Sequence, residues 1–177
     1  MLTRRRFLEC NALSATAGLL AANLGACRRW SPVQTPPLAF LTPAELLIVS
    51  AACECILPRD DDPGAIDLGV PLYIDRTLAG EDHHRQRDRF RAGLHALDVE
   101  ALERARKPYV EIERAHQDNI IDDWQVGTGE QAEFVRLLVR LTLEGAFGDP
   151  SYGGNRNGQG WRLIGFEPCE PHRHQQG

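Results

Sequence analysis

Residues 90–101 read FRAGLHALDVEA, and this stretch decides the fold class. Phe90, Leu94, Leu97 and Ala101 follow one another at intervals of four, three and four residues. This is the spacing of one face of an α-helix, because the helix turns once every 3.6 residues. The stretch therefore predicts a helix with one apolar face, which other elements must cover.

The sequence before this helix contains a second one with a clear start and end. Thr42, Pro43 and Glu45 supply an N-cap, a proline in the first turn and the glutamate of a capping box. The helix is predicted to run to about Leu57 and to stop before Pro58. Its apolar stripe consists of Val49, Cys53 and Ile56.

Three further helices are predicted. A short one covers residues 70–78 between Gly69 and Gly80, and a weaker pattern covers 109–124. The last begins at Thr128 or Gly129 and ends near residues 147–148. Alternating patterns typical of β-strands do not recur. We therefore predict a mostly α-helical fold, a small helical bundle with a long Gly- and aromatic-rich C-terminal loop.

Length and charge limit the possible functions. The chain has 177 residues, of which about 130 remain for one domain once the terminal segments are set aside. Three of the 20 Lys and Arg residues and one of the 25 acids precede Cys27, so the remainder has a net charge of −7. Such an acidic body repels phosphate backbones, and we expect no nucleic-acid partner.

The N-terminus has the layout of an export signal. Arg4 and Arg5 precede Phe7 and Leu8, and an uncharged, moderately apolar run follows at residues 10–26. A basic start followed by an apolar run is typical of export signals, and the arginine pair resembles the twin-arginine type, which carries folded cargo. Residues 1–26 are therefore predicted to be a cleavable twin-arginine signal.

The signal ends in Leu24-Gly25-Ala26-Cys27, which resembles a bacterial lipobox. We predict that Cys27 is lipidated and becomes the first residue of a membrane-associated periplasmic lipoprotein. The alternative is a plain cleavable signal with an incidental cysteine. Residues 27–40 are predicted to be an extended tether, 41–167 the helical domain and 168–177 a disordered tail.

Few residues point to chemistry within this chain. Cys53 and Cys55 lie two apart on a predicted helix, so their side chains point in different directions and cannot bond to each other. The acidic turn at residues 60–62 lacks the spacing of an EF-hand. The sequence shows no recognisable catalytic motif, and we expect no metal, no cofactor and no catalytic residue here. Cys169, His172 and His174 give the tail some potential for binding a soft metal.

The C-terminal segment 148–166 is unusual because it combines glycines with large aromatic residues. Tyr152, Trp161 and Phe166 lie among glycines at 148, 153, 154, 158, 160 and 165. One interpretation is that the aromatic side chains fold back over the bundle. The other is that they contact another protein, since Tyr and Trp are favoured at interfaces.

Several stretches together resemble the gluconate 2-dehydrogenase subunit 3 family. They are Thr42-Pro43-Ala44-Glu45, Ile56-Leu57-Pro58, Gly69-Val70-Pro71 with Tyr73-Ile74-Asp75, and Leu143-Glu144-Gly145 through Gly165-Phe166. The most specific part is residues 148–155, GDPSYGGN. Residues 101–123 and the tail show no family pattern.

The resemblance implies a small, non-catalytic subunit of an oxidoreductase complex. In that family it accompanies a large FAD-dependent subunit of the glucose–methanol–choline type, often with a cytochrome subunit that holds haem c. The resemblance also implies that the twin-arginine export machinery takes the partner across with this chain. The expected partner-binding residues are Asp149, Tyr152, Gly153, Gly154, Asn155, Trp161 and Phe166.

A different function remains open at this stage. The chain could be a self-standing periplasmic lipoprotein with a binding or metal-handling role, using the acidic turn and the histidine-containing tail. An independent enzyme is a third hypothesis.

Overall fold

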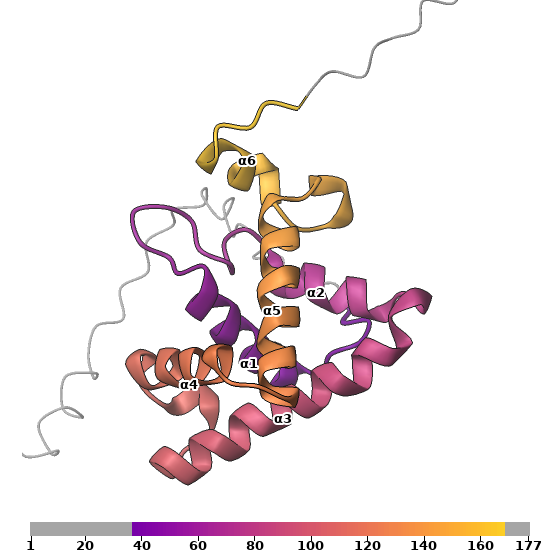
Figure 1. The fold of residues 1–177 in the computed structure, drawn as a ribbon. Helices are drawn as coiled ribbons and strands as arrows, with labels where there is room; N and C mark the ends of the chain where they lie inside the picture. The colour runs from indigo at the N-terminus through magenta and orange to yellow at the C-terminus, as the bar shows by residue number, and fades with distance from the viewer. Residues whose placement is uncertain (1–36, 169–177) are drawn as a thin grey trace, which may run out of the picture. The chain divides into compact units, whose positions relative to one another are not determined.

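The computed structural model of the chain describes residues 37–168. The predicted signal with Arg4, Arg5, Phe7 and Leu8, the lipidation site Cys27 and the tail from Cys169 onwards lie outside the described residues. Within them there are six α-helices and no strand, which confirms the predicted fold class (Figure 1). The helices are α1 (Pro43–Ile56), α2 (Val70–Ala79), α3 (His84–Ala105), α4 (Arg114–Val126), α5 (Glu130–Phe147) and α6 (Gln159–Leu163).

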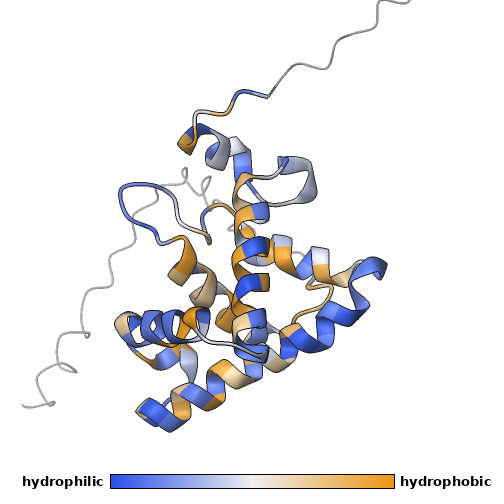
Figure 2. Ribbon diagram, in the orientation of Figure 1, coloured by the Kyte–Doolittle hydropathy of each residue, from blue (hydrophilic) through white to orange (hydrophobic). Residues whose placement is uncertain are grey.

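Helix α5 is the centre of the bundle and contacts each of the other five α-helices (Figure 1). Its sequence explains this position, because apolar and small residues recur around most of its circumference. The buried residues of α5 are Ala132, Phe134, Val135, Leu138, Leu141, Thr142, Gly145 and Ala146. Figure 2 shows apolar residues where the helices face one another and polar residues on the outward faces.

The helix starts and ends follow the local signals in the sequence. At α1, the Thr42 hydroxyl accepts from the Glu45 N–H at 3.2 Å, and the Glu45 carboxylate accepts from the Thr42 N–H at 2.7 Å. Both bonds of the predicted capping box are therefore present. Helix α2 lies between Gly69 and Gly80 as predicted. No helix among residues 37–168 has the length and hydrophobicity needed to cross a bilayer.

The weak helix predicted for residues 109–124 starts later than expected. Tyr109 begins a 3₁₀ turn, η2 (Tyr109–Glu111), and α4 begins only at Arg114. The Tyr109 ring is fully buried, its N–H donates to Asp98 and its carbonyl accepts from Gln117. These contacts with α3 and α4 hold residue 109 in a turn, so the helix begins five residues later.

The C-terminal segment contains more regular structure than the predicted loop. After α5 it forms two 3₁₀ turns, η3 (Pro150–Tyr152) and η4 (Arg156–Gly158), followed by α6. Figure 1 shows this segment at one end of α5, on the side of α2. It therefore packs against the bundle instead of extending from it.

Candidate partner-binding surface

Asn155 holds the C-terminal segment together from the inside. Its backbone has φ +42°, in the left-handed region that Asn tolerates better than most residues, and the residue is fully buried. The side-chain N–H donates to the Gly148 carbonyl and the side-chain oxygen accepts from the Gly160 N–H, both at 2.8 Å. One amide thus connects the end of α5 to the start of α6.

Two glycines let this segment lie directly on the backbone of α5. A methyl group at Gly154 would be 2.2 Å from the Gly145 carbonyl oxygen, and one at Gly160 would be 1.8 Å from the Ala146 carbonyl oxygen. Neither position therefore has room for a side chain. The Asn155 N–H also donates to the Gly145 carbonyl at 2.6 Å, which fixes the segment against the helix.

Helix α2 holds the segment from the other side. Tyr73 and Arg76 lie on one face of α2, because they are three residues apart, and Gly69 is the N-cap of this helix. The Tyr73 ring packs on Gly145, where an added methyl group would be 2.8 Å from a ring carbon. The Arg76 side chain lies in the same way against Gly153, which has φ +92°.

Trp161 links α6 to the end of α5. Its indole N–H donates to the Phe147 carbonyl at 2.7 Å. This carbonyl has no partner within α5, because it belongs to the last turn of the helix. The Trp161 and Phe166 rings meet edge to face with centroids 5.2 Å apart. Trp161 is half-buried, whereas half of the Phe166 surface is exposed.

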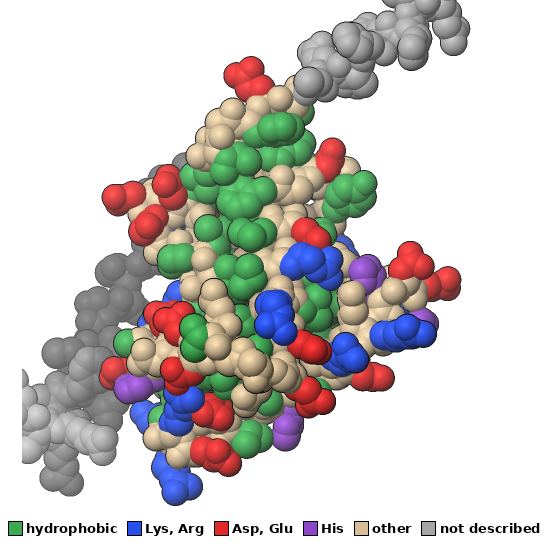
Figure 3. All heavy atoms as spheres, viewed as in Figure 1, with side chains coloured by type: hydrophobic (Ala, Val, Ile, Leu, Met, Phe, Trp, Pro, Cys, Tyr) green, Lys and Arg blue, Asp and Glu red, His purple; other side chains and the backbone are tan. Residues whose placement is uncertain are grey.

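These contacts create an exposed apolar surface at this end of the molecule. We call it the C-terminal apolar patch, and it consists of Leu143, Phe147, Trp161, Ile164 and Phe166. Ile164 is 57% exposed and Leu143 is 45% exposed. Figure 3 shows apolar side chains gathered over α6 and the adjoining half of α5. Large apolar residues grouped in this way are typical of protein interaction sites.

The two remaining predicted site residues lie in the turn η3. Asp149 caps this turn by accepting from the Ser151 N–H at 2.8 Å, and this hydrogen bond lowers the pKa of its carboxyl group. Tyr152 is 70% exposed. Sequence reasoning treated the seven residues as one set, but the structure separates them. Gly154 and Asn155 are internal, Trp161 is intermediate, and Tyr152 and Phe166 are the exposed aromatic residues.

Sequence reasoning missed the role of Asp75. This residue of α2 is 2% exposed, and its carboxylate accepts from the backbone N–H groups of Ala39, Phe40 and Leu41 at 2.7, 2.9 and 2.7 Å. Arg91 adds a cation–π contact with the Phe40 ring at 4.4 Å. Residues 39–41 are therefore fixed to the domain. The three hydrogen-bond donors to Asp75 lie 34 to 36 residues earlier in the chain, so no signal for this role was visible in the sequence.

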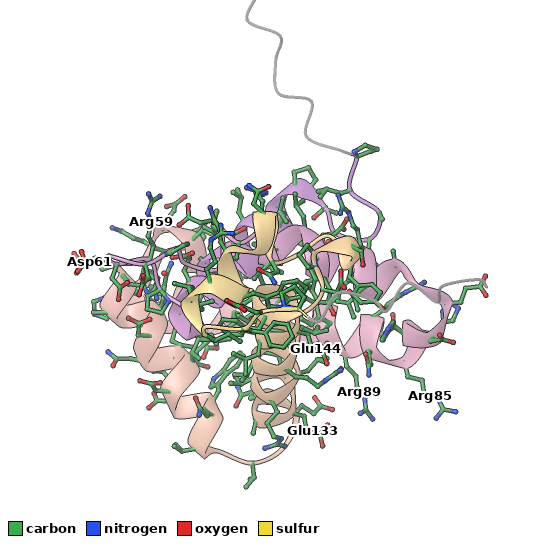
Figure 4. All side chains as sticks on the ribbon, turned by 90° about the horizontal axis from the view of Figure 1, so that it is seen from above. Arg59, Asp61, Arg85, Arg89, Glu133 and Glu144 are labelled. Atoms are coloured by element: carbon green, nitrogen blue, oxygen red, sulfur yellow. The ribbon has the colours of Figure 1, made fainter. Side chains whose placement is uncertain are left out.

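A groove of about 800 Å³ lies between α3 and α5. Its lining includes Ala92, Gly93 and Phe134, together with Arg89 and Glu133, which form an ion pair at 3.6 Å and point outward (Figure 4). A methyl group at Gly93 would be 2.0 Å from the Phe134 ring, so this glycine permits the close packing of the two helices. The groove brings together no pair of residues with an evident chemical role.

Other residues considered from the sequence are used locally. Burial raises the pKa of both Cys53 and Cys55 from 9.0 to about 12, so both thiols stay protonated. In the acidic turn, Asp60 accepts from the Asp62 N–H, and Asp67 pairs with Arg59. Within residues 37–168 no three Asp, Glu, His or Cys side chains converge as metal ligands.

Comparison with known proteins supports the resemblance seen in the sequence. A family model described as gluconate 2-dehydrogenase subunit 3 matches residues 43–168, which is most of the chain. The match begins at the first residue of α1 and includes the whole C-terminal segment. The comparisons with curated proteins and with solved structures give no match.

Proposed function

Because the chain belongs to the gluconate 2-dehydrogenase subunit 3 family, we propose that it is a non-catalytic accessory subunit of an FAD-dependent dehydrogenase complex. In this proposal the chain binds and stabilises a large catalytic subunit of the glucose–methanol–choline type. The flavin belongs to that subunit, and haem c to a cytochrome subunit where one is present. The reaction oxidises a sugar or sugar acid such as gluconate.

The observation that supports this role most is the C-terminal apolar patch. Ile164 and Phe166 stay largely exposed, although the segment that carries them is held by several internal hydrogen bonds. Burying these side chains against a partner would contribute roughly 25 cal/mol for each Å² of apolar surface removed from water. A segment that is already ordered also loses little conformational entropy on binding.

Export is the second part of the proposal. The twin-arginine signal, with Arg4 and Arg5, carries folded cargo, and the resemblance implies that the large subunit crosses the membrane bound to this chain. The complex would then be held at the periplasmic face of the membrane through a lipid on Cys27.

The binding role is tested by replacing exposed patch residues that lie outside the hydrophobic core. Ile164→Ser together with Phe166→Ser should reduce the amount of large subunit that co-purifies with this chain by about tenfold. Val126→Ser is a matched control, because Val126 is 86% exposed at the end of α4 and outside the patch. Equal yields of complex from the double variant and the control would refute the role of the patch.

The export role has a separate test. Arg4→Lys together with Arg5→Lys should leave both this chain and the large subunit in the cytoplasm, as measured by dehydrogenase activity in fractionated cells. Normal export of the large subunit in this variant would show that it does not depend on this chain.

A further inference from the structure

Two arginines beside the C-terminal segment are available for a partner. Among residues 37–168, Arg76 and Arg156 have no carboxylate within 4 Å and their side chains make no hydrogen bond. Several other arginines are ion-paired, including Arg59, Arg104 and Arg140. Arg85, Arg106, Lys107 and Arg136 also lack a carboxylate within 4 Å in this part of the chain, so Arg76 and Arg156 are distinguished by their position beside the C-terminal segment.

Both arginine side chains lie over glycines. Arg76 lies against Gly153, where an added methyl group would be 2.1 Å from its Nη1. Arg156 lies over Gly69, where an added methyl group would be 3.4 Å from its Nη2. Both glycines have positive φ, +92° and +78°. Arg76 therefore packs closely on the Gly153 backbone, whereas the space between Arg156 and Gly69 would admit a methyl group.

The two arginines belong to one surface that also carries Tyr152. Arg76 lies on α2, seven residues after Gly69, which is roughly 10 Å along the helix. Tyr152 directly precedes Gly153 and is 70% exposed. The Arg156 N–H donates to the Leu68 carbonyl at 3.0 Å, which ties the segment to the start of α2. We call Arg76, Tyr152 and Arg156 the Arg–Tyr cluster.

The acids near the cluster in the chain have other partners. Asp75, next to Arg76, accepts from three backbone N–H groups of residues 39–41. Asp149 accepts from the Ser151 N–H, and Glu144 is paired with Arg140 at 2.9 Å while it also accepts from the Tyr73 hydroxyl. None of these carboxylates neutralises Arg76 or Arg156. The cluster thus presents two positive charges, and the exposed Tyr152 directly precedes the glycine that Arg76 contacts.

We propose that the Arg–Tyr cluster binds a carboxylate-rich surface of the partner subunit, next to the contact made by the C-terminal apolar patch. Guanidinium groups recognise carboxylates with two parallel hydrogen bonds, and Arg and Tyr are favoured at the centres of interfaces. This inference rests on the proposed function, because it specifies the surface and the charge by which the same partner is recognised. Electrostatic attraction of this kind sets orientation and association rate.

The test measures binding of the full mature chain to the purified FAD-dependent subunit at low and high salt. Arg76→Glu together with Arg156→Glu should weaken binding at least about tenfold at low salt, and the difference should shrink at high salt. The control is Arg85→Glu. Arg85 is exposed, has no carboxylate within 4 Å among the described residues and points outward from the start of α3, away from the C-terminal segment (Figure 4).

A second double variant shows whether a loss of binding comes from misfolding. Arg76→Gln together with Arg156→Gln removes the charges but keeps polar side chains of similar reach, so the circular dichroism spectrum should be unchanged and binding should still weaken. If the wild-type chain binds but none of these variants weakens binding more than Arg85→Glu, the inference is wrong and the proposed function stands. If the wild-type chain does not bind the FAD-dependent subunit, both are wrong.

Discussion

Removal of the Asn155 side chain is the sharpest test of how the C-terminal segment is held. In Asn155→Ala the Gly160 N–H, which is buried, loses its acceptor, at a cost of about 2 kcal/mol. The half-buried Gly148 carbonyl loses its donor, at about 1 kcal/mol. Alanine in the left-handed region costs about 1 kcal/mol more than asparagine. The free energy needed to open the segment should therefore fall by about 4 kcal/mol.

Asn157→Ala is the matched control for this variant. Asn157 also has a left-handed backbone, with φ +59°, but it is exposed and its side chain makes no hydrogen bond within residues 37–168. It should lose only the conformational contribution of about 1 kcal/mol. The difference of about 3 kcal/mol between the two variants isolates the two side-chain hydrogen bonds.

Hydrogen–deuterium exchange of residues 153–163 is the appropriate assay, because it reports local opening of the segment. A loss of about 4 kcal/mol corresponds to roughly a thousandfold faster exchange where opening is local, since each 1.4 kcal/mol is a factor of ten. Urea unfolding followed by circular dichroism measures the effect on the whole domain. If Asn155→Ala and Asn157→Ala exchanged at the same rate, the assigned role of Asn155 would be refuted.

Three other predictions concern the rest of the fold. Asp75→Asn should destabilise the domain by about 2–4 kcal/mol in urea unfolding, because an amide cannot accept hydrogen bonds from all three backbone N–H groups. Residues 37–42 should also become accessible to proteases. An unchanged urea midpoint would contradict this prediction. Gly93→Ala should lower the stability of the domain by about 2 kcal/mol in thermal unfolding, because the added methyl group would overlap the Phe134 ring. An unchanged melting temperature would show that α3 and α5 can move apart without loss of stability. Cys53 and Cys55 should resist maleimide at pH 8 in the native protein but react in urea, as read by mass spectrometry of their peptides, because burial raises both pKa values from 9.0 to about 12. Labelling of the native protein at pH 8 would contradict the burial of the two thiols. The folded state keeps the thiol protons to a higher pH than the unfolded state does, so the free energy of unfolding should also fall as the pH rises above 9.

The helices were predictable from the sequence where local signals are strong. Thr42 and Glu45 form the capping box that their spacing indicates, and the Phe90–Ala101 stripe is buried in α3 as its periodicity requires. The start of α4 was predicted wrongly because the burial of Tyr109 depends on Asp98 and Gln117, which the pattern around residue 109 does not reveal. Pro108 directly precedes the turn at Tyr109, and a proline at that position already favoured a turn over a helix start.

The candidate site was predictable as a segment but not in the roles of its residues. Glycines at 153 and 154 indicated an unusual backbone. Only the fold shows that a side chain at residue 154 would collide with a carbonyl of α5, and that one at residue 153 would collide with the Arg76 side chain. The contribution of Asp75 was not visible, because its three donors lie 34 to 36 residues away in the chain. Such roles arise from contacts between distant residues, which residue type and spacing alone do not specify.

The position of Asp75 also determines how the domain responds to force. Any pull transmitted through the residues before Pro37 reaches the fold at residues 39–41, where three hydrogen bonds to one carboxylate share the load. The next residue of α2, Arg76, touches Gly153, so the same short helix receives the load and supports the far end of the domain. A chain anchored to a membrane at its N-terminus would therefore carry tension into α2 through Asp75 and into α3 through Arg91, whose guanidinium donates to the Phe40 carbonyl at 2.7 Å.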